Sequence, residues 1–379
     1  MKKIISFTDY YWPGYKAGGT IRAFMNQVDY LKPEFEFFIV TRNTDYTETK
    51  PYPGITPDRW TALAPNVNVF YTSAANQTAG TFTALLKETR YDVVYIHLLF
   101  GYSFSILPLV LAKKQKYSRI IICPHGNLGS GALAVKPLKK KIFLGAARLS
   151  GYYNGTVFHS VTPHETADII THIGEKTTIS EARELPRKAS SPPQRNQKAA
   201  GKLSIVTVAR IAPEKNQLYA LEILSRFTSY EIRYDLIGPV YDEAYWKKCQ
   251  DLIGAMPSNI TVNYRGSINS DKIPGELQTY DMMLLPTTGE NFGHTILESF
   301  MAGCPVIISN RTPWKDLERS GVGRDIPLEN PEGFTEALEF FASLDDTKFD
   351  LFSKSAFSFA MEYMANPEML AENIKLFNL

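Results

Sequence analysis

The residues with the richest chemistry lie in one segment, where two glutamates flank a short polar loop. Glu290 and Glu298 have seven residues between them, and one of these is Gly293, which lets a backbone approach a ligand closely. A buried strand is predicted to end at Pro286 and a helix to begin near His294. A helix start offers unpaired N–H groups and a partial positive charge. The segment could therefore hold a ligand that carries both hydroxyls and phosphates.

Two cations follow a predicted strand in the middle of the chain. Arg210 and Lys215 come after an apolar run that begins at Leu203, with a helical pattern just beyond them. A guanidinium fork and a compact ammonium together suit a diphosphate. A solvated turn is the structural alternative for these cations, and a helix-dipole role is the alternative for either Glu290 or Glu298 alone.

Two other segments carry weaker signals. Gly18 and Gly19 precede a predicted helix, where they fit either a phosphate-approach loop or a flexible turn. His125 follows an apolar strand and precedes several glycines, which fits either a catalytic or a structural histidine. No dinucleotide-binding or P-loop glycine spacing occurs, so a dehydrogenase is disfavoured.

Apolar runs of strand length alternate with helical patterns along the chain, which predicts α/β structure with parallel sheets covered on both faces. A chain of 379 residues is long enough for two domains. We expect two doubly wound domains, at 1–182 and 203–356, joined by a linker at 183–202. In the first half, strands are predicted at 3–8, 35–41, 93–97, 120–124 and 156–159, and a long loop at 46–64.

Composition narrows the function further. Lys and Arg number 41 against 39 Asp and Glu, and this net charge of +2 argues against bulk nucleic-acid binding. The cysteines, Cys123, Cys249 and Cys304, are too scattered for a disulfide framework or a zinc site. They favour a reducing compartment. Neither a signal peptide nor a membrane span is visible, so we expect a cytoplasmic protein.

A basic segment at 136–148 combines several lysines with Leu138, Ile142 and Phe143. A basic amphipathic helix can lie on an anionic membrane, here the inner face of the cytoplasmic membrane. The structural alternative is a solvated charged face whose apolar side chains cover the core.

Taken together, the glutamate pair, the two cations, the glycine loop and the histidine segment resemble the family 4 retaining glycosyltransferases. The resemblance spans most of the chain. It implies the GT-B fold, in which two Rossmann-like domains have the active site between them. By this resemblance, 1–182 would be the acceptor-side domain, completed by a C-terminal helix at 357–379, and 203–356 the nucleotide-sugar donor domain. The glutamate pair looks like the family's pair with seven intervening residues, and the cations fall on its strand-loop arginine and lysine. The chain departs from the family at Leu185, where the family's usual Asn-Gly-Val turn is replaced.

The resemblance implies a role for each matching residue. Glu298 would bind the ribose diol and Glu290 the donor-sugar hydroxyls. Arg210 and Lys215 would neutralise the departing diphosphate, and His125 would face the donor sugar or the acceptor hydroxyl. The expected substrate-binding residues also include the glycine loop and the loop after the buried strand: Gly18, Gly19, Asn291, Phe292, Gly293, His294 and Thr295. His294 stands where the family often has a smaller polar residue, so a narrower donor pocket is expected.

The expected reaction is retaining transfer of a hexose or N-acetylhexosamine in surface polysaccharide or glycoconjugate synthesis. The donor would be a nucleoside diphosphate sugar, expected to be UDP-linked, and the acceptor a glycan or lipid-linked glycan. No cofactor and no metal are expected. Two alternatives stay open, namely a nucleotide-sugar epimerase of the same fold and a non-catalytic subunit that binds a nucleotide sugar.

Overall fold

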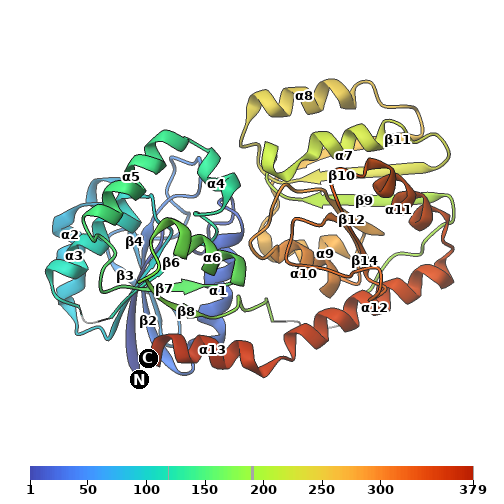
Figure 1. Cartoon of the computed structure of the whole chain (residues 1–379). Coiled ribbons are helices and arrows are strands. Elements are labelled where there is room, and N and C mark those ends of the chain that lie inside the picture. The colour runs from blue at the N-terminus through green and yellow to red at the C-terminus, as the bar shows by residue number, and fades with distance from the viewer. Residues whose placement is uncertain (118, 189–191, 379) are drawn as a thin grey trace. The chain divides into compact units, whose positions relative to one another are not determined.

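The computed structural model describes residues 1–117, 119–188 and 192–378 and divides into two compact units. Unit 1 comprises Met1–Leu185 and Pro367–Leu379, and unit 2 comprises Pro186–Asn366. Each unit is built on its own sheet with helices on both faces (Figure 1). The predicted α/β class with two doubly wound sheets is confirmed.

The sheet of unit 1 has the strand order β3-β4-β2-β1-β5-β6-β7-β8 in the described residues. All neighbouring pairs are parallel except β3 and β4, which are antiparallel. The strands are β1 (Lys2–Phe7), β2 (Phe35–Arg42), β3 (Trp60–Ala64), β4 (Val67–Thr72), β5 (Val93–His97), β6 (Ile120–Cys123), β7 (Val157–Ser160) and β8 (Thr178–Glu181).

The five strands predicted for this half of the chain are confirmed to within a residue or two at their ends. The predicted long loop at 46–64 is wrong at its end, which forms the edge strand β3. Its Trp60 ring packs edge-on against Phe38 and Phe70, at 5.4 Å from each ring centre. These partners lie on other strands, so the stabilising contact is tertiary and the local pattern could not reveal it.

Helices cover both faces of the first sheet. One face packs on α1 (Gly19–Leu31) and α13 (Pro367–Asn378), and the buried rings of Phe35 and Phe377 lie 5.6 Å apart there. The other face packs on α2 (Ala79–Glu88), α3 (Leu107–Lys114), α5 (Pro137–Leu149) and α6 (Pro163–His172). The short helix α4 (Ser130–Ala134) precedes α5.

The sheet of unit 2 is parallel throughout the described residues, with the order β11-β10-β9-β12-β13-β14. Its strands are β9 (Lys202–Val208), β10 (Glu231–Ile237), β11 (Ile260–Gly266), β12 (Met282–Leu285), β13 (Val306–Ser309) and β14 (Gly323–Ile326). The helices α7 (Gln217–Leu224), α8 (Glu243–Ile253) and α11 (Pro331–Ser343) pack on one face. The other face packs on α9 (Ile273–Leu277), α10 (His294–Met301) and much of α12 (Asp346–Met364).

The two sheets share one topology. The series β4-β2-β1-β5-β6-β7 in unit 1 and β11-β10-β9-β12-β13-β14 in unit 2 both run third, second, first, fourth, fifth, sixth. The direction of winding therefore reverses between β1 and β5 and between β9 and β12. Open α/β sheets bind ligands beyond the carboxyl ends of the strands at such a reversal, here called the switch point.

The C-terminal segment differs from its prediction. A single helix was expected at 357–379, whereas two helices meet near Asn366, with α12 in unit 2 and α13 in unit 1. Pro367 explains the break, because a proline disfavours the helical conformation of the residue before it.

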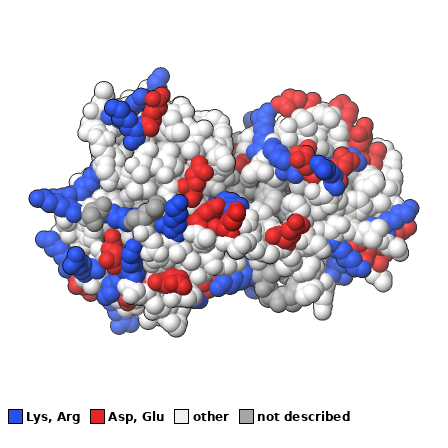
Figure 2. Space-filling view, turned by 60° about the horizontal axis from the view of Figure 1, so that its bottom comes forward, with Lys and Arg blue, Asp and Glu red and all other residues white. Residues whose placement is uncertain are grey.

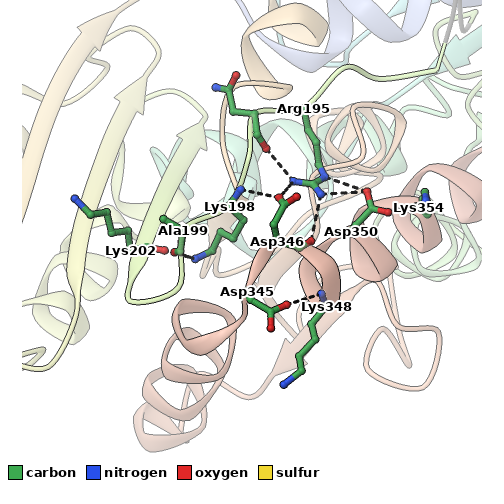
Figure 3. A network of polar contacts seen from close by, with 10 residues as sticks. Arg195, Lys198, Ala199, Lys202, Asp345, Asp346, Lys348, Asp350 and Lys354 are labelled. Carbon is green, nitrogen blue, oxygen red and sulfur yellow. Dashed lines mark hydrogen bonds and ion pairs between the residues drawn. The ribbon is translucent and has the colours of Figure 1, made fainter.

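The expected linker at 183–202 makes ordered contacts near both of its ends, and its residues 189–191 lie outside the described part of the chain. Arg183 pairs with Glu372 of α13 at 2.6 Å. Arg195 pairs with Asp346 and Asp350 of α12 at 2.6 and 3.1 Å, and the Lys198 amide donates to Asp346 (Figure 3). The structure places the boundary between the units at Leu185, near the start of this segment.

The surface chemistry matches the near-neutral composition. On the face in Figure 2, basic and acidic side chains are interspersed and neither sign covers the surface. None of the helices in the described residues is both long and apolar enough to cross a membrane.

Candidate functional site

The loops that follow β9 and β12 are joined at the switch point of unit 2. The Glu214 carbonyl, after β9, accepts hydrogen bonds from the Thr287 hydroxyl and the Thr288 amide, after β12, each at 2.9 Å. Gly238, at the end of β10, lies so close to the first loop that a Cβ there would be 2.0 Å from the Ala209 carbonyl oxygen. The backbone thus fixes the two loops against each other before any charged side chain contributes.

Two residues to which the sequence gives separate roles contact each other directly. The Lys215 ammonium forms an ion pair with Oε1 of Glu290, and both side chains are largely buried. Arg210 lies in the same loop as Lys215, pairs with Glu214 at 2.8 Å and stacks over the Tyr241 ring at 5.1 Å. Because an ammonium has three donors, a bound anion could add to this pair or replace the carboxylate.

The second predicted glutamate is held by a residue that sequence reasoning missed. Glu298 lies in α10, is 7% exposed and accepts a hydrogen bond from Nε of Arg187 at 3.2 Å. Arg187 also donates to the Ser270 carbonyl at 2.7 Å and pairs with Asp271 at 3.3 Å. These bonds fix the direction of the Glu298 carboxylate. The signal available in the sequence was a basic residue just after the departure from the family pattern at Leu185.

The loop before α10 has a conformation that depends on Gly293 and on a second missed residue, Trp314. Gly293 has φ of +83°, the left-handed region, and a Cβ there would lie 2.8 Å from a side-chain carbon of Ile296. The Trp314 indole donates to the Phe292 carbonyl at 2.7 Å. Phe292 in turn packs edge-on against His294, the first residue of α10, at 4.8 Å. The helix start is therefore held firmly beside the Glu290 loop, and Asn291 and Thr295 lie on either side of this turn.

In unit 1, the predicted glycine loop follows β1. Gly18 has φ of +90° and Gly19 begins α1, with open space around the Cβ position of Gly18. The carboxylate of Asp45 accepts the Tyr15 amide at 3.0 Å and the Lys16 amide at 3.3 Å. The glycine loop is thus supported by Asp45, which lies in the segment that follows β2. The sequence did not indicate this support.

The predicted histidine belongs to a buried polar cluster. The His125 side chain is 6% exposed, its Nδ1 lies 3.9 Å from Glu184, and its Nε2 lies 2.9 Å from Nδ1 of His97. His125 has φ of +50°, and the buried Glu165 carboxylate accepts the next amide, of Gly126, at 2.6 Å. Glu165 lies in the first turn of α6, and Thr162 caps this helix by accepting the Glu165 amide at 3.1 Å. Sequence reasoning singled out His125 but none of these four neighbours.

The surroundings of His97 and His125 shift the pKa values of the two imidazoles in opposite directions. Burial lowers the pKa of His97, and the neighbouring His125 lowers it further. Burial also opposes a charge on His125, but Cys123 and Glu184 outweigh burial and raise the pKa of His125. His125 therefore holds the proton that the pair shares and donates it from Nε2 to neutral His97.

The structure thus separates the predicted residues into two sets. Unit 2 brings together the loops of Arg210, Lys215 and Glu290 and holds Glu298 in the neighbouring helix, whereas unit 1 holds the glycine loop and His125. The Phe24 ring of α1, the helix that Gly19 begins, packs on His97 at 4.0 Å and so connects the two parts of the second set. Among the described residues, no three His, Cys, Asp or Glu side chains are placed to hold a metal ion, and metal independence stays a prediction.

Comparison with known proteins identifies this arrangement. Residues 191–352 match the family model described as glycosyl transferases group 1. The matched segment lies within unit 2. The chain as a whole has the GT-B fold, since it resembles sucrose-phosphate synthase from Thermosynechococcus elongatus with a TM-score of 0.71 and 12% identity, covering 100% of this chain and 98% of that one.

Two curated relatives match the chain at low sequence identity. The chain is 23% identical over 268 residues to an uncharacterized 41.2 kDa protein in the cps region of Klebsiella pneumoniae, covering 67% of this chain and 70% of that protein. It is 25% identical over 175 residues to the UDP-N-acetylglucosamine–peptide N-acetylglucosaminyltransferase GtfA subunit of Streptococcus parasanguinis, covering 45% of this chain and 32% of that subunit. The family match supports sugar transfer as the general activity.

Proposed function

We propose that the protein is a retaining glycosyltransferase. It transfers a sugar from a UDP-sugar donor to a glycan or lipid-linked glycan acceptor during surface polysaccharide or glycoconjugate synthesis. The observation that carries this proposal is the Lys215–Glu290 pair at the switch point of unit 2, with Arg210 in the same loop. The donor base is proposed from the UDP-sugar named for the GtfA subunit.

In this proposal the donor diphosphate binds to Arg210 and Lys215. Its negative charge replaces that of Glu290 beside Lys215, and the freed carboxylate can accept hydrogen bonds from the donor-sugar hydroxyls. When the bond between the sugar C1 and the phosphate oxygen breaks, negative charge develops on the diphosphate next to both cations. Fixed charges placed where charge develops lower the barrier.

Retention of configuration requires attack from the face that the diphosphate leaves. The acceptor oxygen forms a bond to C1 on that face, and its proton passes to the departing phosphate oxygen, so atoms and charges balance without a covalent enzyme intermediate. No carboxylate acts as a nucleophile, in contrast to retaining glycosidases. No metal enters this scheme.

Glu298 is proposed to bind the ribose diol, with Arg187 as the residue that positions its carboxylate. The amides of Phe292, Gly293 and Thr295 face the sugar and phosphates in this proposal, with Asn291 and His294 limiting the donor pocket. Helix starts bind phosphate oxygens in this way because their amides are unpaired.

Unit 1 is proposed to supply the remaining contacts, on the acceptor side. Gly18 and Gly19 would let the backbone approach the substrate closely. Because the His125 ring is buried against His97 and Glu184, we assign its contact with the donor sugar or the acceptor to the turn that it forms with Gly126.

The test is a thermal-shift and turnover experiment on the full chain with UDP, GDP, ADP and their sugars, with and without EDTA. A saturating ligand at a hundred times its Kd stabilises a protein by about 2.7 kcal/mol. Stabilisation by UDP and its sugars alone, unchanged by EDTA and lost in Lys215→Ala, would support the proposed donor site. Stabilisation by none of them would refute it.

Product analysis separates the alternatives. Release of UDP together with a glycoside of retained configuration is expected. Conversion of the nucleotide sugar into an epimer without acceptor would instead indicate an epimerase, and binding without any turnover a non-catalytic subunit.

A further inference from the structure

Helix α5 of unit 1 carries a stripe of large apolar side chains in solvent. Leu138 is 69% exposed, Ile142 63% and Leu149 92%. With Gly145, these positions recur every three or four residues, so they lie on one face of the helix. Val135, just before the helix, is also 60% exposed.

The opposite face of α5 packs on the core of unit 1. Leu144 and Ala147 are buried, and the Phe143 ring packs against Phe100 and Tyr152 at 5.7 and 6.1 Å. The structural alternative for residues 136–148, a charged face whose apolar side chains cover the core, therefore accounts for Phe143 and leaves Leu138 and Ile142 unexplained.

Cations flank the exposed stripe. Lys139 lies on one side of it, and Lys141 and Arg148 lie on the other, by the helical periodicity. Within the described part of the chain, no carboxylate lies within ion-pairing distance of these three cations or of Lys136. Lys140, by contrast, turns inward, where its ammonium donates to the Ala132 carbonyl at 2.6 Å and lies over the Phe100 ring at 5.1 Å.

The charge around α5 has one sign over a long stretch of sequence. From Val93 to His164 the chain contains no aspartate or glutamate but nine lysines and arginines. This one-sided segment is unusual in a chain whose total charge is only +2. The cations are Lys113, Lys114, Lys116, Arg119, Lys136, Lys139, Lys140, Lys141 and Arg148.

We infer that α5 is a docking surface for an anionic lipid bilayer. Leu138, Ile142 and Leu149 enter the boundary between headgroups and acyl chains, while Lys139, Lys141 and Arg148 contact the anionic headgroups. A helix with an apolar face bounded by cations binds such a surface through apolar burial and charge attraction together. Each cation near the surface contributes about fivefold to the partition coefficient.

The test is co-sedimentation of the full chain with vesicles of phosphatidylcholine alone and with vesicles of phosphatidylcholine and phosphatidylglycerol. We expect binding to the anionic vesicles that weakens as salt increases, because salt screens surface charges. The double variant L138E/I142E should bind at least about tenfold more weakly. The matched control is L351E, since Leu351 is 64% exposed on α12 of unit 2.

A charge variant provides the second arm. K139Q/K141Q should lose about tenfold or more in binding to anionic vesicles, whereas K247Q/K248Q, which alters two adjacent exposed lysines of α8, should not. All the altered side chains are exposed, so melting temperatures and UDP-induced stabilisation should stay unchanged. That last measurement separates a failure of membrane docking from a failure of the proposed transferase function.

A labelling experiment locates the contact. The native cysteines are buried, so a dye sensitive to polarity can be attached selectively to the variant Ile142→Cys. Its emission should shift to the blue on adding anionic vesicles, while that of a labelled Leu351→Cys variant should not. Equal binding to both kinds of vesicle, binding unaffected by L138E/I142E, or a lipid-free dimer that the same variant dissociates would each overturn the inference.

Discussion

The two sheets share a strand order but hold opposite chemistry at their switch points. In unit 2 the loops present opposite charges, with Lys215 paired to Glu290 and the partly exposed Arg210 beside them. In unit 1 the corresponding edge holds the buried His97 and the nearly buried His125, which hydrogen-bond each other.

This difference shows how one topology serves two purposes. Paired charges that keep some exposure to solvent can exchange partners with an incoming anion, as the diphosphate site proposed for unit 2 requires. A buried polar cluster leaves its groups no exchangeable partner, so that of unit 1 is suited to holding backbone in a fixed shape. Substitutions should therefore affect ligand binding in unit 2 and backbone geometry in unit 1.

The largest effect is expected from Lys215→Ala. Removing one charge that stabilises a transition state costs about 10²–10³ in rate, so kcat for sugar transfer should fall by that factor. Steady-state release of UDP measures it. Lys247→Ala is the matched control, because Lys247 is also ion-paired but lies exposed on α8. Loss of activity by less than about threefold in Lys215→Ala would remove the charge pair from the mechanism.

Arg210→Ala should weaken UDP binding by about 10- to 100-fold, the worth of one hydrogen bond to a charged group. Isothermal titration with UDP measures this directly. Arg324→Ala, which removes an ion-paired arginine from β14 of the same unit, should leave the Kd unchanged. An unchanged Kd in Arg210→Ala would place the diphosphate elsewhere.

Glu184→Gln should act on unit 1 and leave UDP binding alone. Since Glu184 raises the pKa of His125, its neutralisation should lower that pKa, and the imidazole should lose its proton at a lower pH. Titration of histidine ring signals by NMR detects the shift. Transfer activity should fall by about tenfold through the displaced turn, and an unshifted titration would contradict the assigned proton sharing.

Asp235→Asn should change stability without changing UDP binding. Burial by itself would raise the pKa of Asp235, but hydrogen bonds, foremost from Arg233, lower it to about 2. A lowered pKa stabilises the fold above the ordinary carboxyl range, and this stabilisation is lost as the pH falls from about 4 through 2. Chemical unfolding at pH 7 should therefore show a loss of about 2 kcal/mol that shrinks by pH 3. Equal losses at both pH values would refute the assignment.

Much of the scaffold follows from local pattern. Strands such as β5 and helices such as α5 and α8 lie where continuous apolar runs and helical periodicity place them. The edge strand β3 and the break between α12 and α13 were not predicted. The first depends on packing between strands, whereas the second follows from Pro367, a local signal that the helical pattern on both sides of it outweighed.

The candidate site divides in the same way. The spacing of Glu290 and Glu298 and the cations after β9 single out the residues of the proposed donor site from the sequence alone, because parallel strands bring their carboxyl ends to one edge of a sheet. The supporting residues are not found this way. Arg187 reaches Glu298 across 111 positions of sequence, and Glu165 reaches the turn after His125 across 39.

Periodicity and residue type alone are therefore enough to predict the α/β class, the doubly wound sheets and the candidate reactive side chains. The pairing of Lys215 with Glu290, the burial of the His125 ring, and the exposure of Leu138 and Ile142 beside a packed Phe143 emerge only in the folded chain. Such contacts and exposures depend on which elements pack together, and no local pattern along the chain contains that information.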